Sequence, residues 1–328
     1  MMSFDDAFDS LLLDKKPSII LGNGFSQSWN SDIFNYSQLY NVANFGERHE
    51  AITAIFTHLD TFDFEKVMQS LISAETILSI YDKHNPLILR IKEDQDILKN
   101  ALINAISEKH PALPSAINND SYVVARGFLS KFSNIFTLNY DLLVYWAKNK
   151  ETLAPVGYNI DDGFRAKKKW QGFGTEQRVH CLHGGIYIYE EQGEVKKHAC
   201  TYKGTTIIEQ VRANLKENKF PLFVSEPTSQ KKKERIKSNA YLYFCFRKLK
   251  RLDGVIFIHG HSFDENDRHI FTELDSSSVD KVYISIFGDE FSEQNRQVKA
   301  NANAFLASAT RSVEFYQAET TPIWKEDL

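Results

Sequence analysis

The chain has 328 residues, enough for one large α/β domain with insertions or for two modest domains. With 42% hydrophobic residues, 25% charged residues and a formal net charge of -4, the composition is typical of a folded globular protein and excludes a disordered chain. The N-terminus lacks the basic start and apolar core of a secretion signal, and no apolar run reaches the roughly 20 residues that span a bilayer. We therefore expect a cytoplasmic protein with no membrane partner.

Cysteine usage argues against two kinds of structural site. Cys181, Cys200 and Cys245 are odd in number, widely spaced and without a Cys-x-x-Cys pair. A disulfide framework needs paired cysteines, and a four-cysteine zinc module needs more than the chain has. We expect free or buried thiols.

Short runs of β-branched and aromatic residues recur along the chain, each ending in small or polar residues. Continuous apolar runs are typical of strands buried on both faces of a parallel sheet. We predict a single α/β domain over 1–328, a Rossmann-like, doubly wound parallel sheet with two insertions. The runs are 18–21, 134–137, 179–182, 255–258 and 282–286, with a sixth candidate at 313–316.

The two predicted insertions differ in pattern. Between the first two runs, residues such as Phe64, Val67 and Leu71 recur at three- and four-residue spacing, which indicates a helical insertion over 35–130. Segment 150–225 combines a glycine- and proline-containing loop with a hairpin-like stretch, which indicates a loop and small α+β insertion.

A glycine-rich turn, Gly22-Asn23-Gly24-Phe25-Ser26, directly follows the first predicted strand. Glycines at a strand end let the backbone approach a diphosphate, and the amides that begin the next helix attract its negative charge. The turn lacks the third glycine of the dinucleotide fingerprint, so a purely structural turn remains an equal alternative.

The second cluster, Thr137-Leu138-Asn139-Tyr140-Asp141, also stands at the end of a predicted strand. Asn139 or Asp141 could simply cap the following helix. Alternatively, the carboxamide holds ribose hydroxyls or a water, and the carboxylate orients the same ligand.

The third cluster is His183-Gly184-Gly185, after the run that ends at Leu182. Glycines beside the histidine suggest open space in front of its ring, and a near-neutral pKa suits proton transfer. A structural histidine is the alternative.

The fourth cluster, residues 259–262, has the sequence His-Gly-His-Ser and is followed by Asp264 and Asp267. Its glycine and hydroxyl suit a ribose or phosphate, and either aspartate could cap the next helix. The two histidines with Asp264 suggest a metal site, but they stand at i and i+2, so we predict no metal.

Because the carboxyl ends of parallel strands share one crevice, the four clusters are expected to converge. Together they resemble the sirtuin-like superfamily, in particular its NAD-hydrolase branch in bacterial antiphage defence, over about residues 15 to 290. The family motifs Gly-x-Gly-x-Ser, Gln/Thr-x-Asn-x-Asp, His-Gly and Gly-x-Ser correspond in order to Gly22–Ser26, Thr137–Asp141, His183-Gly184 and Gly260-His261-Ser262.

The resemblance implies that NAD is the substrate and assigns a role to each matching residue. Asn139 would hold the nicotinamide ribose and the attacking water, His183 would be the general base, and Asp141 would support the nicotinamide pocket. The other residues expected to bind NAD are Gly22, Asn23, Gly24, Phe25 and Ser26 at the diphosphate, and Gly260, His261 and Ser262 on the adenosine side.

Two departures from the sirtuin pattern argue against protein deacetylation. The chain lacks the four-cysteine zinc module after His-Gly, and Asp32-Ile33-Phe34 stands where Asp-Phe-Arg is usual. Water then becomes the expected acceptor, which makes the chain an NAD glycohydrolase that depletes NAD in abortive infection. The alternatives are an ADP-ribosyltransferase and a non-enzymatic nucleotide-binding regulatory subunit.

The resemblance also implies partners. Defence hydrolases of this kind are held inactive by oligomeric packing or by a sensor, so we expect a homo-oligomer or a complex with a sensor or activator subunit, one candidate being a nucleotide-sensing pyrophosphatase-like protein. The basic runs Lys231-Lys232-Lys233 and 246–251 are interpreted as solvated helix faces, so nucleic acid is not expected as a partner.

Overall fold

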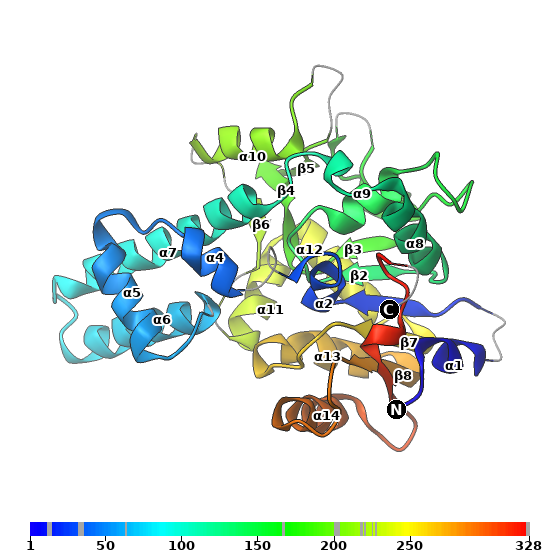
Figure 1. Ribbon diagram of the computed structural model, residues 1–328. Coiled ribbons are helices and arrows are strands. Elements are labelled where there is room, and N and C mark those ends of the chain that lie inside the picture. Colours follow the sequence, from blue (N-terminus) through cyan, green and yellow to red (C-terminus); the bar gives the residue numbers. More distant parts are fainter. Residues whose placement is uncertain are drawn as a thin grey trace.

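A six-stranded sheet forms the centre of the molecule, in the order β3-β2-β1-β7-β8-β9 with all neighbours parallel (Figure 1). The strands are β1 (Ser18–Leu21), β2 (Ile135–Thr137), β3 (Val179–Cys181), β7 (Asp253–His259), β8 (Ser278–Ile286) and β9 (Ser312–Gln317). Counted within this sheet, the order is 3-2-1-4-5-6, that of doubly wound dinucleotide-binding folds. The predicted fold class is confirmed. The computed structural model describes residues 1–11, 15–31, 36–62, 64–165, 168–199, 204–216, 219, 221–224, 226 and 228–325.

Helices cover both faces of this sheet, which explains why its strands are apolar throughout. On one face, the Phe257 ring lies 5.7 Å from Phe4 of α1 (Phe4–Asp9). On the other, the His180 ring lies 6.4 Å from Phe244 of α12 (Ala240–Leu249). The remaining helices around the sheet are α2 (Asn23–Gln27), α8 (Asn119–Ser130), α9 (Leu143–Asn149), α11 (Ser229–Ser238), α13 (Arg268–Asp275) and α14 (Glu293–Leu306).

The described residues of segment 35–130 are mostly helical, and Figure 1 shows α5, α6 and α7 extending to one side of the sheet. Phe45, Phe56 and Phe64 form a small aromatic core there, with ring centroids 5.1 to 6.3 Å apart. In contrast, α8 packs on the sheet, because its Phe128 ring lies 6.1 Å from the ring of His259 in β7. The helices between residue 35 and α8 are α4 (Tyr36–Val42), α5 (His49–His58), α6 (Phe64–Tyr81) and α7 (Leu87–Lys109).

Segment 150–225 contains the core strand β3 and a second, antiparallel sheet in the order β5-β4-β6. Its elements are β4 (Gly184–Glu191), β5 (Glu194–Lys197), α10 (Ile207–Lys216) and β6 (Pro221–Phe223). Single 3-10 turns occur at Gly46–Arg48, Pro114–Ala116, Gly172–Gly174, Glu265–Asp267 and Ala318–Thr320. None of the helices in the described ranges has the length and apolar character that a membrane crossing requires.

Candidate functional site

The strand order reverses between β1 and β7, where dinucleotide-binding sheets hold their ligands. Gly22 follows β1 and donates its amide to the His259 carbonyl at 2.8 Å, while the Gly24 amide donates to Gly260 at 2.9 Å. A Cβ on Gly24 would lie 2.5 Å from the Gly260 Cα, and a Cβ on Gly22 would collide with the Gly260 carbonyl oxygen. Glycine is therefore required here by the approach of two strand ends.

The amides of this turn bond to the protein itself. The Phe25 amide donates to the Gly22 carbonyl at 3.1 Å, and the following helix α2 has only five residues. The Phe25 side chain is buried against Trp324, with ring centroids 5.3 Å apart, whereas Asn23 is exposed. The assignment of this turn to the NAD diphosphate stays a prediction.

Asn139, Ser26 and Asp141 form one hydrogen-bonded network across β1 and β2. The Asn139 Nδ2 donates to the Gly22 carbonyl and to the Ser26 hydroxyl, both at 2.9 Å. Ser26, fully buried, donates its only hydroxyl proton to the Asp141 carboxylate. Asp141 also accepts from the Leu143 amide at 2.8 Å, so it caps the start of α9 as well. Burial raises the pKa of Asp141, and both of these hydrogen bonds oppose that rise.

His183 lies just after the end of β3 and is only 3% exposed. The prediction of open space in front of its ring is therefore wrong. The adjacent Gly184 has φ +81, and a Cβ there would collide with the Leu222 carbonyl oxygen. Glycine is needed here for β4 to pair with β6. This pairing explains the glycine after His183, and no open space beside the ring is needed to explain it. Burial lowers the pKa of His183 well below 6.5, although Asp267 opposes the shift, so its imidazole is neutral.

Asp267 joins several of the polar side chains near His183. The Lys232 ammonium donates to its Oδ1 at 2.9 Å, and His261 Nε2 lies 3.2 Å from its Oδ2. Burial by itself would raise the pKa of Asp267, but Lys232 and His261 hold it well below its usual range. The carboxylate is therefore ionised, and His183 Nε2 lies 3.7 Å from it.

The side chains at the end of β7 and in the loop that follows it have different partners. His259 Nδ1 lies 2.9 Å from the Tyr316 hydroxyl, His261 faces Asp267, and the exposed Ser262 donates to Asp264 at 2.8 Å. The metal site considered for the two histidines with Asp264 is not assembled. The amide of Phe263, whose φ is +57, donates to His261 Nδ1 at 2.8 Å, so Nδ1 acts as an acceptor and Nε2 is the ring nitrogen that faces Asp267.

Two of the side chains that surround His183 and Asp267 were missed by the sequence analysis. Lys232, interpreted as part of a solvated basic face, is 1% exposed, and that interpretation is wrong for this residue. Lys232 and Ile236 are the residues of α11 found buried, and their i, i+4 spacing is the signal that could have identified the buried face. His269, at the start of α13, faces His183 with 3.3 Å between their Nε2 atoms.

The predicted strand ends do meet at one edge of the sheet. Thr137 pairs with Leu21 on one side and with Cys181 on the other, and Leu21 pairs with His259. The residues that follow these strands, including Asn139, therefore lie side by side. The Tyr140 and His183 rings are stacked at 6.5 Å. Asn139 and His183 thus occupy neighbouring strand ends.

A large open cavity of about 1490 Å³ lies at the opposite edge of the sheet. Its lining includes Ser18, Asn134, Asp253 and Ser278, which stand at or just before the beginnings of strands. Ligands of open α/β sheets bind outside the carboxyl ends, so size alone does not make this cavity the site.

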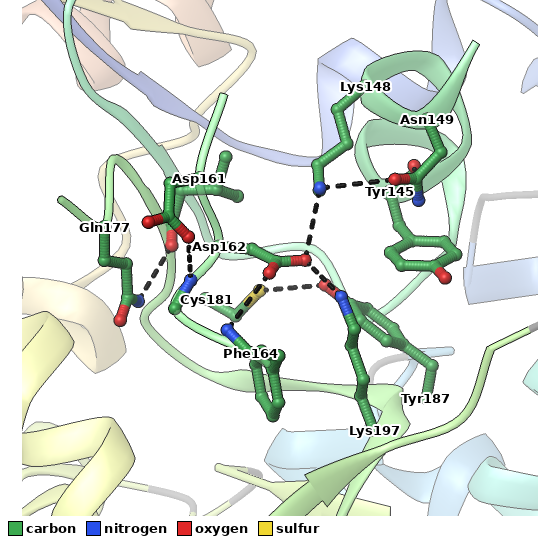
Figure 2. A network of polar contacts seen from close by, with 12 residues as sticks. Tyr145, Lys148, Asn149, Asp161, Asp162, Phe164, Gln177, Cys181, Tyr187 and Lys197 are labelled. Carbon is green, nitrogen blue, oxygen red and sulfur yellow. Dashed lines mark hydrogen bonds and ion pairs between the residues drawn. The ribbon is translucent and has the colours of Figure 1, made fainter. Parts of the chain in front are cut away.

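A separate charged cluster joins three parts of the chain: α9, β5 and the loop that precedes β3 (Figure 2). Asp162 accepts from Lys197 at 2.6 Å and lies 3.3 Å from the Lys148 ammonium. Nearby, Cys181 Sγ lies 3.3 Å from the Tyr187 hydroxyl, and burial raises the pKa of this thiol. Cys181 and Cys245 are buried free thiols, as expected. Cys200 and Asp32-Ile33-Phe34 lie outside the described residues.

Comparison with known proteins identifies a family but no activity. The search of curated proteins found no match to the chain. A family model described as a domain of unknown function, DUF4917, matches residues 19–324. Because that match covers well over half of the chain, the chain belongs to the DUF4917 family.

Proposed function

We propose that the chain is a sirtuin-like NAD glycohydrolase that cleaves NAD to nicotinamide and ADP-ribose and depletes cellular NAD in antiphage defence. The observation that carries the proposal is the position of Asn139 and His183 on neighbouring strand ends beside the reversal of strand order. The sequence resemblance supplies the substrate, and sheets with this strand order bind dinucleotides outside the carboxyl ends of their strands.

Asn139 is held in one orientation. Its Nδ2 group donates to Gly22 and Ser26, so the carbonyl oxygen Oδ1 is directed away from this network. That oxygen would accept a hydrogen bond from a ribose hydroxyl or from the attacking water. Asp141, through Ser26, is a positioning residue that fixes the amide.

In the proposed reaction, the bond between the ribose C1′ and the nicotinamide nitrogen breaks and its electron pair leaves with neutral nicotinamide. The ribose becomes oxocarbenium-like, and polar groups aimed at it stabilise the transition state more than the ground state. The water oxygen then bonds to C1′, and a water proton passes to the base.

His183 would accept that proton on Nε2, since burial keeps the imidazole neutral. Asp267, 3.7 Å away, would stabilise the imidazolium that forms. Because His183 is buried among His269 and Asp267, hydrolysis requires the substrate to open the end of β3 far enough for water to reach Nε2.

The test is chromatography of NAD incubated with the wild type, Asn139→Ala and His183→Ala, each alone and with the product of the neighbouring gene. Loss of either side chain should lower nicotinamide release by about a hundred- to ten-thousand-fold. The matched controls are Asn303→Ala on the exposed side of α14 and His84→Ala, also exposed, and both should retain wild-type turnover.

Three results would count against the proposal. Equal turnover by wild type, Asn139→Ala and His183→Ala would remove these residues from the site. Covalent transfer of label from NAD to a macromolecule would indicate an ADP-ribosyltransferase. NAD binding without nicotinamide release, with or without the neighbouring protein, would indicate a regulatory subunit.

A further inference from the structure

Three side chains with metal-ligating atoms converge beside the end of β3. They are His183, Asp267 and His269, and one ligand atom of each lies within 4.8 Å of the others. The two histidine Nε2 atoms are 3.3 Å apart, and His183 Nε2 is 3.7 Å from the Asp267 Oδ1. Zinc–nitrogen bonds of about 2.0–2.1 Å at a tetrahedral angle place two nitrogens about 3.3 Å apart. The histidine pair already has this separation.

The chemistry of the three groups favours a particular class of ion. Two imidazoles with one carboxylate suit divalent transition metals such as Zn²⁺, whereas Ca²⁺ and Mg²⁺ prefer oxygen ligands. Both histidines are buried, but the Asp267 side chain is 19% exposed. Three protein ligands and a partly open side leave a fourth position for water.

Neighbouring groups orient these ligands as the outer partners of metal sites do. The Ser229 hydroxyl lies 3.3 Å from His269 Nδ1 and accepts from the His269 backbone amide at 2.8 Å. It can therefore accept the Nδ1 proton and leave Nε2 to the metal. On the other side, His261 Nε2 lies 3.2 Å from the Asp267 Oδ2. This contact leaves Oδ1 as the oxygen directed toward His183.

Lys232 opposes a cation at this place. Its ammonium lies 2.9 Å from the same Asp267 Oδ1 that a metal would use. A carboxylate oxygen can accept more than one partner, but two cations on one oxygen repel. Metal affinity is therefore set partly by Lys232, and removing its charge should strengthen binding.

We propose that His183, His269 and Asp267 bind one divalent transition metal, with Zn²⁺ as the test ion. The consequence for catalysis rests on the proposed function: a metal on His183 Nε2 occupies the lone pair that would accept the proton from water. Zinc would then inhibit NAD hydrolysis reversibly.

The direct test is titration of the chelator-treated full chain with Co²⁺, followed by visible absorption, and with Zn²⁺, followed by calorimetry. We expect one ion per chain. His183→Ala and His269→Ala should weaken binding by at least about a hundredfold, since even outer partners contribute ten- to a hundredfold. The exposed His84→Ala serves as the control and should bind as the wild type does. Equal affinity in wild type, His183→Ala and His269→Ala would overturn the proposal.

Two further variants separate direct ligation from loss of folding. His269→Cys should retain Co²⁺ and add a thiolate-to-cobalt charge-transfer band, which a misfolded chain would not show; absence of that band in folded protein contradicts ligation. Lys232→Met should bind more tightly than wild type, and unchanged or weaker binding contradicts the placement on Asp267 Oδ1.

The proposed metal site and the proposed NAD hydrolysis can be contradicted separately by these experiments. Stoichiometric binding by a chain that never releases nicotinamide would support the metal site and contradict the proposed function. Full turnover in the presence of saturating Zn²⁺ would contradict inhibition through His183.

Discussion

Two aspartates of this protein each accept a hydrogen bond from a lysine, yet their surroundings differ. Asp162 is enclosed by Lys148 and Lys197 and accepts from the Phe164 amide at 3.2 Å. Asp267 holds one lysine, and its other neighbours are the imidazoles of His183 and His261. A lysine held by a carboxylate has no lone pair to offer, whereas a neutral imidazole can take a proton or a metal. A buried charge therefore does not mark a site unless groups capable of chemistry surround it.

The strongest test of this contrast replaces each aspartate by asparagine. Both Asp162→Asn and Asp267→Asn leave lysine ammonium groups buried without a carboxylate, which should lower the free energy of unfolding by about 3–5 kcal/mol in urea denaturation. The Asp161→Asn control breaks a more exposed pair with Arg165 and should cost at most about 1 kcal/mol.

The two variants should differ in function. The folded fraction of Asp162→Asn should retain Zn²⁺ binding, and Asp267→Asn should lose it. Loss of zinc binding by folded Asp162→Asn would break the distinction between the two clusters.

A second test asks how much of the glycine turn beside the Asn139 network is structural. Gly24→Ala places a Cβ 2.5 Å from the Gly260 Cα, so the strand ends must separate, at a cost of about 1–3 kcal/mol. In contrast, no described atom lies within 4 Å of a Cβ at Gly127 in α8. Gly127→Ala should raise stability by about 0.5–1 kcal/mol in the same thermal or urea unfolding experiment. Equal changes in the free energy of unfolding for Gly24→Ala and Gly127→Ala would show that the close approach of Gly24 to Gly260 does not constrain the turn.

A third test concerns His110, a buried base held by backbone groups. Leu142 donates its amide to His110 Nε2 at 2.9 Å, and the Pro111 carbonyl lies 3.0 Å from Nδ1. Burial lowers the pKa of His110 to about 4 from its usual 6.5. Below pH 6.5 this histidine is protonated in the unfolded chain, whereas in the folded chain it stays neutral down to about pH 4. The free energy of unfolding therefore falls as the pH falls through this interval.

At pH 5 this loss should be on the order of 2 kcal/mol. Urea unfolding between pH 7 and 5 measures it, and His110→Gln should flatten the pH dependence. The exposed His84→Gln should leave the slope unchanged. An identical slope in His110→Gln and the wild type would place the acid sensitivity elsewhere.

The central strands were predictable from local pattern because a strand buried on both faces is a continuous apolar run. The predicted run 18–21 coincides with β1, and 134–137 exceeds β2 by one residue. The runs 255–258 and 282–286 fall inside β7 and β8, whose polar first residues carry no such signal. The convergence of Asn139 and His183 on one edge also followed from strand position, because parallel strands end on the same side.

The partners of each polar group depended on contacts between distant segments. Lys232 is separated from Asp267 by 35 residues. The i, i+4 spacing with Ile236 can indicate a buried face of the helix, but it does not identify Asp267 as the partner of the ammonium. Similarly, the glycine after His183 is required by the close approach of the Leu222 carbonyl of β6, a contact that the local sequence does not reveal. The order of apolar runs and polar ends in the sequence thus determined the sheet and the edge where the polar ends meet. Only tertiary packing decided which groups are buried, because desolvation and pairing depend on neighbours from elsewhere in the chain.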